Sequence, residues 1–115
     1  MARPLPILRE RYRHFRSIDL RWNDVDRFGH VNNAVFFELF DTAVNLWLAD
    51  VGLFQKDHEP ICVVARHACD YFFEIKQSDK IEIALAIEAI GTSSLTYLPA
   101  LFRRGDNHPA AQGTY

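Results

Sequence analysis

The sequence contains little cysteine and no recognisable metal-binding pattern. Cys62 and Cys69 are its only cysteines. Both fall on what the pattern predicts to be one strand, where their odd spacing places them on opposite faces, too far apart to form a disulfide. The five histidines show no metal-ligand spacing with them. Together with the absence of a signal-peptide pattern, two free thiols favour a cytoplasmic protein. Because the ligand spacing is missing, neither a metal ion nor a cofactor is expected.

The chain also has a small net charge and no long hydrophobic run. Thirteen Lys and Arg against 15 Asp and Glu give a formal charge of −2, which offers no reason to expect nucleic acid or an anionic membrane as a partner. No apolar run reaches the length of a membrane span. The chain is instead rich in aromatic residues, with nine Phe among 115 residues. The length predicts a single domain over residues 1–115. The high Phe content predicts a bulky interior or a subunit interface.

Alternating apolar and polar residues predict several short strands. They cover residues 17–22, 61–73, 81–89 and 95–102, and a further strand begins at about residue 112. Residues 104–107 predict a hairpin turn, and Pro99 indicates a bulge or an edge position. Residues 1–13 carry two prolines and four arginines and are expected to form an irregular arm. Its positive charge is either that of a solvated tail or a contact for a phosphorylated ligand.

A helix is predicted over about residues 33–51, with Gly52 as its C′ residue. It is apolar around most of its circumference, and its polar residues form only a narrow stripe of Glu38, Asp41, Thr42 and Asn45. Such a helix must be buried nearly all round, including Phe40 and Trp47. The expected fold class is therefore α+β, with an antiparallel sheet wrapped around one long central helix.

The polar loop directly ahead of this helix combines an acid, an imidazole and a helix N-terminus. From Asp24 it reads Asp-Val-Asp-Arg-Phe-Gly-His-Val-Asn-Asn. The N–H groups of about Val31 to Ala34 lack helical partners and are expected to point into the loop, and the Asn pair can cap the helix. Taken singly, Asp, Gly and Asn are ordinary turn residues. Together they form a place that could polarise a carbonyl and activate water.

The run Asp24-x-Asp26-x-x-Gly29-His30-Val31-Asn32-Asn33 resembles the signature of hotdog-fold acyl-CoA thioesterases of the 4-hydroxybenzoyl-CoA thioesterase-like family. The following helix and the strand pattern beyond residue 61 are similar to that family as well. The resemblance implies a hotdog fold and an acyl-CoA substrate hydrolysed to free acid and CoA. It also implies a homodimer or tetramer formed by pairing of sheet edges. Because a hotdog domain needs the strand that begins near residue 112, the chain is expected to be truncated after Tyr115.

The resemblance assigns catalysis to Asp26, as nucleophile or general base, because the second Asp of the family's signature is the catalytic one. Asp24 is the competing carboxylate, and its expected role is to brace the loop. His30 has two open roles: it either positions water or the thioester carbonyl, or it fixes the loop. Asp41, on the polar stripe of the helix, is a fallback acid.

The expected substrate-binding residues surround these groups in the loop and on one strand. They are Phe28, Gly29, Val31, Asn32, Asn33 and Arg66. Phe28 offers an apolar wall, and Gly29 lets a ligand approach the backbone closely. Arg66 is either an exposed strand residue or a contact for the CoA phosphates.

Three alternatives to acyl-CoA hydrolysis follow from the same residues. Acyl-ACP thioesterases carry a similar run with an Asn where this chain has Phe28, so the match favours the acyl-CoA group. Enoyl-CoA hydratases of the same fold separate their Asp and His by four residues, whereas three lie between Asp26 and His30. A non-catalytic acyl-CoA-binding module stays open, because a loop can keep its shape without activity.

Overall fold

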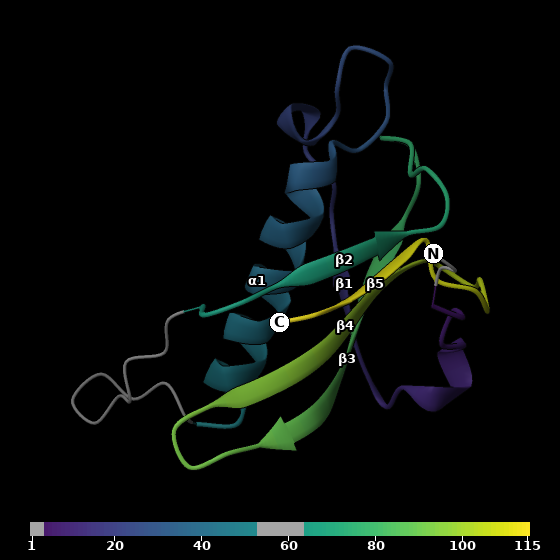
Figure 1. The fold of residues 1–115 in the computed structure, drawn as a ribbon. Helices are drawn as coiled ribbons and strands as arrows, with labels where there is room; N and C mark the ends of the chain where they lie inside the picture. Colours follow the sequence, from purple (N-terminus) through teal and green to yellow (C-terminus); the bar gives the residue numbers. More distant parts are fainter. Residues whose placement is uncertain (1–3, 53–63) are drawn as a thin grey trace.

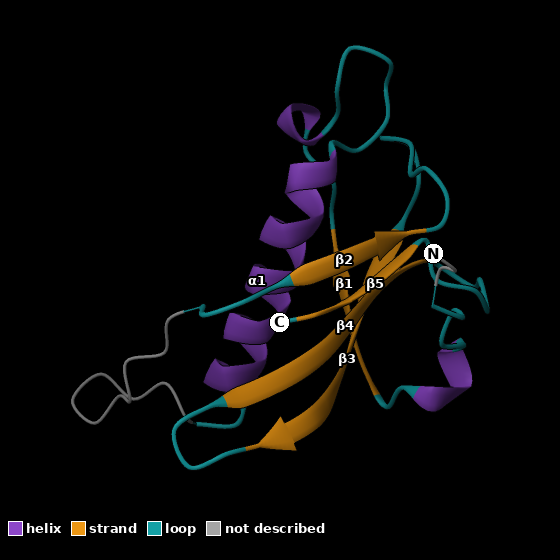
Figure 2. Cartoon of the chain, in the orientation of Figure 1, coloured by secondary structure: helices purple, strands orange, loops and turns teal. Residues whose placement is uncertain are grey.

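A computed structural model describes residues 4–52 and 64–115, which form one long helix and a five-stranded antiparallel sheet (Figure 1). The helix is α1 (Asn33–Asp50), and the strands are β1 (His14–Ile18), β2 (Ala68–Tyr71), β3 (Ile81–Ile90), β4 (Leu95–Arg103) and β5 (Ala111–Thr114). The sheet order is β1-β3-β4-β5-β2, so β1 and β2 form its edges. Figure 2 shows α1 lying along one face of this sheet. The predicted α+β class is confirmed.

The helix begins and ends close to where its capping residues predicted. Asn32 is the N-cap, and its side chain accepts a hydrogen bond from the Ala34 N–H at 2.9 Å. At the other end, Gly52 has a φ of 78° and donates its N–H to the Ala49 carbonyl. No helix within residues 4–52 and 64–115, α1 included, has the length and apolar character needed to cross a membrane.

Only one face of α1 is buried in this chain. The buried residues are Val35, Phe36, Leu39, Phe40, Ala43, Val44 and Leu48. They form one hydrophobic core with sheet residues that include Ile83 of β3 and Leu101 of β4. Phe40 is buried as predicted, whereas Trp47 is only half-buried and Leu46 is exposed. The expectation of burial nearly all round the helix is therefore wrong for the single chain. A sheet that covers one face leaves the opposite apolar residues open.

The first strand lies earlier than the alternation predicted. β1 runs from His14 to Ile18 rather than over residues 17–22, and Trp22, expected on its buried face, is 78% exposed in a short 3-10 turn. Register explains the difference, because Ile18 pairs with Ile81, the first residue of β3. Beyond that pair no partner strand is present among the described residues, so the alternation continues without a strand.

The second strand is shorter than predicted. β2 covers Ala68–Tyr71, and residues 64–67 of the predicted segment are exposed and irregular, whereas residues 61–63, with Cys62, lie outside the described residues. The strand ends where its partner begins, since Tyr71 pairs with Ala111, the first residue of β5. The N–H groups of residues 72 and 73 then both donate to the Ala110 carbonyl. Here too the partner sets the boundary.

Strands β3 and β4 and the hairpin turn after β4 follow the prediction closely, but Pro99 does not mark an edge or a bulge. β4 lies between β3 and β5, and Pro99 is paired in register with Leu85. The irregularity is in β3, between Ile87 and Ala89. Since proline has no N–H, it cannot donate to the strand on its other side, where β4 pairs with β5 at Ala100 and Leu101 and the backbones of Tyr97 and Tyr115 pair again beyond it.

The N-terminal arm packs on the outer face of the sheet. Tyr12 is 6% exposed and contacts the Phe102 ring edge-on at 5.7 Å between centroids. Arg9 forms an ion pair with Glu82 at 2.9 Å and lies over the Phe102 ring. The arm is irregular as expected, but its positions 9 and 12 are not those of a solvated tail.

Candidate active site

The loop between residues 25 and 31 is closed by backbone hydrogen bonds. Val25 and Val31 form an antiparallel bridge, and the Asp26 N–H donates to the His30 carbonyl at 2.8 Å. Gly29 has a φ of 80°, and a Cβ atom built there would meet nothing within 4 Å. Glycine is therefore required at this position by its backbone conformation. Steric crowding does not explain the glycine, because there is open space around this position.

Asp26 organises this loop with one carboxylate oxygen. Its Oδ1 accepts the N–H groups of Phe28 at 2.8 Å and His30 at 3.2 Å, the arrangement of an Asx turn. Oδ2 has no partner in the part of the chain that the structure describes. The side chain is exposed, so this second oxygen is available to a ligand.

Asp24 has a different environment although it lies two residues away. It is 1% exposed and accepts hydrogen bonds from the Arg21 backbone N–H at 2.7 Å and from the Arg21 guanidinium at 2.8 Å. Burial acts to raise the pKa of this carboxyl group, but the hydrogen bonds and charge of Arg21 outweigh burial and lower the pKa. The Asp24 carbonyl also accepts the Asn32 N–H at 2.9 Å. Asp24 therefore braces the entry to the helix.

Most of the N–H groups expected to be free at the helix start are already paired. Val31 donates to the Ile75 carbonyl at 2.7 Å, Asn32 donates to Asp24, and Ala34 donates to the Asn32 side chain. That part of the prediction is wrong, because a neighbouring chain segment and the cap use these donors. Asn33 is the one of the four whose N–H has no acceptor within the described chain.

His30 is held from the segment that follows β2. It forms a bridge with Lys76, and its Nδ1 lies 3.2 Å from Glu74 Oε2. A carboxylate this close to Nδ1 favours a proton on that nitrogen, which leaves Nε2 as the acceptor of a neutral imidazole. The loop and this segment therefore form one unit that orients the imidazole.

These groups open onto a cavity of about 350 Å³ beside the N-terminus of α1. It is lined by Asp26, His30, Val31, Asn33, Phe36, Tyr71, Phe72, Phe73 and Glu74. One part of the lining thus consists of two carboxylates and an imidazole, and another part consists of aromatic rings. A cavity of this kind can bind an apolar group and present a carbonyl to acid–base groups.

Tyr71 connects the cavity wall to the helix start. Its hydroxyl donates to the Asn33 carbonyl at 2.8 Å, and its ring packs edge-on against Phe36. Burial, with a smaller contribution from Cys69, raises the pKa of Tyr71 to about 12, so the hydroxyl stays protonated. Burial likewise raises the pKa of the Cys69 thiol to about 11. Cys69 is therefore not a thiolate nucleophile at neutral pH.

Several predicted site residues lie away from this cavity. Phe28 is 68% exposed with the Arg27 guanidinium over its ring, and Arg66 is exposed ahead of β2. Asn32 acts as the helix cap. The fallback acid, Asp41, accepts a hydrogen bond from the Tyr115 hydroxyl. Substrate-binding roles for Phe28 and Arg66 stay predictions.

The lining residues that sequence reasoning missed are Phe36, Tyr71, Phe72, Phe73 and Glu74, and two of them, Tyr71 and Glu74, bring polar groups to the loop. Neither stands in a motif, and both reach the loop only because Val31 and His30 pair with residues 75 and 76. The only sequence signal at position 74 is that a charged residue directly follows the aromatic run at 71–73. Within residues 4–52 and 64–115 no three His, Cys, Asp or Glu side chains gather into a possible metal site.

Comparison with known proteins shows the family to which the chain belongs. The model of the thioesterase-like superfamily matches residues 20–114. The PA5185 protein of Pseudomonas aeruginosa is 39% identical and superposes with a TM-score of 0.90 over 96% of this chain and 78% of that one. A thioesterase from Thermus thermophilus, solved with coenzyme A and zinc, is 29% identical with a TM-score of 0.69 over 87% of this chain and 73% of its own. These neighbours bear out the predicted hotdog fold.

A curated relative matches over a shorter stretch. The uncharacterised protein YsmA of Bacillus subtilis is 28% identical over 82 residues, which are 71% of this chain. The match spans 56% of the relative's own length. The similarity therefore concerns only part of that protein.

Proposed function

The chain belongs to the thioesterase-like superfamily, and we propose that it hydrolyses acyl-CoA thioesters to a free acid and CoA in the cavity beside the N-terminus of α1. The observation that carries the proposal is the shared cavity of Asp26, His30 and Asn33. It combines an acid, an imidazole beside Glu74 and a helix N–H, and among the described residues neither Asp26 Oδ2 nor the Asn33 N–H has a partner. The coenzyme A bound to the Thermus thermophilus thioesterase supports CoA as the carrier.

Asp26 is the proposed reacting carboxylate. Because Oδ1 already accepts two backbone N–H groups, Oδ2 is the oxygen proposed to react. As a general base it takes a proton from water, which attacks the thioester carbonyl and expels the CoA thiolate. As a nucleophile it attacks that carbon itself and expels the CoA thiolate, and water then hydrolyses the resulting mixed anhydride to the free acid and the regenerated carboxylate. Both routes need an accessible carboxylate oxygen, and the exposed side chain of Asp26 supplies one.

Asn33 is the proposed source of electrophilic help. Its N–H has no acceptor among the described residues, and it stands at the first position of α1, where the helix dipole adds a partial positive charge. A thioester carbonyl oxygen held there gains negative charge as water or the carboxylate attacks. A preorganised donor at that point lowers the barrier.

His30 is proposed to position the attacking water or the carbonyl. With Nδ1 directed to Glu74, Nε2 remains as the second polar atom of the ring. Glu74 acts through His30 and is therefore a positioning residue. The aromatic rings of Phe36, Phe72 and Phe73 line the same cavity and suit an aromatic or medium-chain acyl group.

A homodimer, or a tetramer built from dimers, is proposed to complete the site. β2 is an edge strand paired only with β5 in the described chain, and cavity residues 71–74 come from its end. A second copy paired along β2 would thus lie beside the cavity and cover its exposed acid. Sedimentation at micromolar protein should show at least a dimer, and a monomer with full activity would contradict this arrangement.

The experiment that tests the function is thiol release from a panel of aromatic, short-chain and medium-chain acyl-CoAs, with hydration of crotonyl-CoA followed in parallel. The proposal expects CoA release with at least one thioester and no hydration. Hydration without CoA release would instead identify a hydratase. Saturable acyl-CoA binding without either reaction would identify a binding module, and both outcomes would overturn the proposal.

A further inference from the structure

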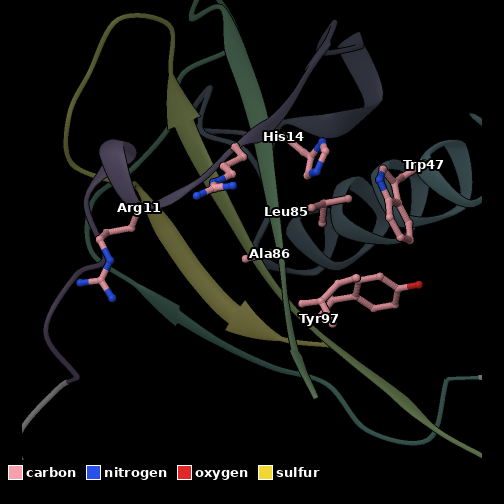
Figure 3. A pocket seen from close by; sticks show the side chains of 8 residues that line it. Arg11, His14, Trp47, Leu85, Ala86 and Tyr97 are labelled. Carbon is pink, nitrogen blue, oxygen red and sulfur yellow. The ribbon is translucent and has the colours of Figure 1, made fainter. Parts of the chain in front are cut away.

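A second cavity of about 350 Å³ lies at the edge where β1 leaves β3 (Figure 3). It is lined by Arg11, Arg13, His14, Trp47, Leu85, Ala86, Ile87 and Tyr97. β1 begins at His14 opposite Leu85, so residues 86–90 of β3 have no partner on this side among the described residues. The chain ahead of His14 turns to the outer face, where Tyr12 is buried. This departure leaves the edge open.

One end of this cavity is apolar and aromatic. Trp47 and Tyr97 meet edge-on at 5.9 Å between centroids, and Leu85 is buried beneath them. Ile87 is 43% exposed. Figure 3 shows Trp47 and Tyr97 at one end of the cavity and Arg11 at the other. The site therefore has an apolar end and a cationic end.

Among the described residues, the cationic end lacks acids of the kind that neutralise the neighbouring arginines. Arg9 pairs with Glu82, and Arg16 pairs with Asp50. Arg11 and Arg13, which lie between them in the chain, have no ion pair within residues 4–52 and 64–115, and both line the cavity with His14. No acidic side chain is among the lining residues that the structure describes. An anionic ligand would therefore complement the positive charge of this end.

We propose that this cavity binds a small amphiphilic carboxylate. The apolar body of the ligand packs between Trp47, Leu85 and Tyr97, and its carboxylate lies at Arg11 and Arg13. A guanidinium binds a carboxylate through two parallel hydrogen bonds, which an uncharged head group of the same length cannot reproduce.

This site is separate from the cavity at the start of the helix. The two share no lining residue, and Trp47 stands in the C-terminal part of α1, whereas Asn33 is its first residue. The inference does not rest on thioester hydrolysis. Its failure would leave the proposed function untouched.

The test uses Trp47 as the reporter. Trp22 is 78% exposed and is the only other tryptophan, so Trp22→Phe leaves Trp47 alone. In that background octanoate should change the fluorescence saturably. Octanol, which has the same apolar chain without a charge, should bind about tenfold more weakly or worse. Equal affinity for octanoate and octanol would overturn the proposal.

A matched pair of variants locates the anion. The double variant Arg11→Gln/Arg13→Gln should lose about tenfold or more in octanoate affinity, with its circular dichroism unchanged because both side chains are exposed. Arg104→Gln, an exposed arginine after β4, should bind octanoate like the parent. Unchanged octanoate affinity in the double variant would show that the acid binds elsewhere and would overturn the proposal.

Discussion

The two ends of α1 border cavities of the same volume, about 350 Å³ each, with different construction. At the N-terminal end, short backbone hydrogen bonds fold one loop onto the segment at 74–77 and bring Asp26, His30 and Glu74 together. At the C-terminal end, side chains from the arm, α1, β3 and β4 meet around Trp47. The first end presents acid–base groups, and the second presents apolar surface with unneutralised arginines.

Chemistry and ligand binding make different structural demands on the two ends of the helix. A reacting carboxylate must be held within a fraction of an ångström, which the Asx turn and backbone bridges of the loop provide. An apolar ligand tolerates looser placement, so an open sheet edge suffices. The following variants test whether the two ends are as distinct as their structures indicate.

The largest expected effect concerns the core that both ends share. Phe40 is 1% exposed in the middle of α1, and Phe40→Ala should lower the free energy of unfolding by about 3–5 kcal/mol, a large part of a total of about 5–15 kcal/mol. Asn45→Ala, on the exposed face, should cost far less outside a subunit contact. Urea denaturation compares the two, and equal small losses would mean that α1 is not the core of the fold.

The next effect separates the bracing acid from the reacting one. Asp24→Asn should lower the free energy of unfolding at pH 7 by about 1–3 kcal/mol, because a buried hydrogen-bonded carboxylate is lost. Since the folded pKa of Asp24 is lowered, its stabilisation is present above the ordinary Asp pKa of about 4. That stabilisation is lost as the pH falls through the folded value.

Chemical denaturation at pH 7 and pH 3 measures this dependence. The difference between the parent and Asp24→Asn should shrink at pH 3, whereas Asp19→Asn, at an exposed position, should show little difference at either pH. Equal stability of the parent and Asp24→Asn at pH 7 would contradict the bracing role.

The smallest effect concerns the imidazole. Glu74→Gln keeps an acceptor near His30 Nδ1 but removes its charge, and should lower kcat about tenfold, or about 1.4 kcal/mol, with KM little changed. The pH profile of kcat should also change, which a purely structural role would not cause. Glu88→Gln, an exposed position at the far end of β3, serves as the control. An unaltered pH profile and kcat would contradict the positioning role of Glu74.

The local elements of this fold could be predicted because their signals are local. The cap at Asn32, the glycine at position 52 and the alternation in β3 each act through near neighbours in sequence. Strand ends could not be predicted in the same way. β1 stops where β3 begins, and β2 stops where β5 begins, so those limits depend on residues more than 35 positions away.

The site was predictable only in part for the same reason. The loop motif predicted Asp26 and His30 as site residues, and the structure brings both to one cavity. It did not reveal that Ile75 and Asp24 accept the N–H groups of residues 31 and 32. The cavity at Trp47 had no sequence signal at all, because four separate segments supply its lining.

The most direct test of the central claim is acyl-CoA turnover by Asp26→Asn beside Asp24→Asn. We expect Asp26→Asn to lower kcat by about a hundredfold or more. Its melting temperature should stay near that of the parent, because Asp26 is exposed and Asn can still accept the loop's N–H groups. Asp24→Asn should lose stability and keep much of its turnover. If Asp24→Asn is the inactive variant and Asp26→Asn turns over normally, the reacting carboxylate has been assigned to the wrong residue.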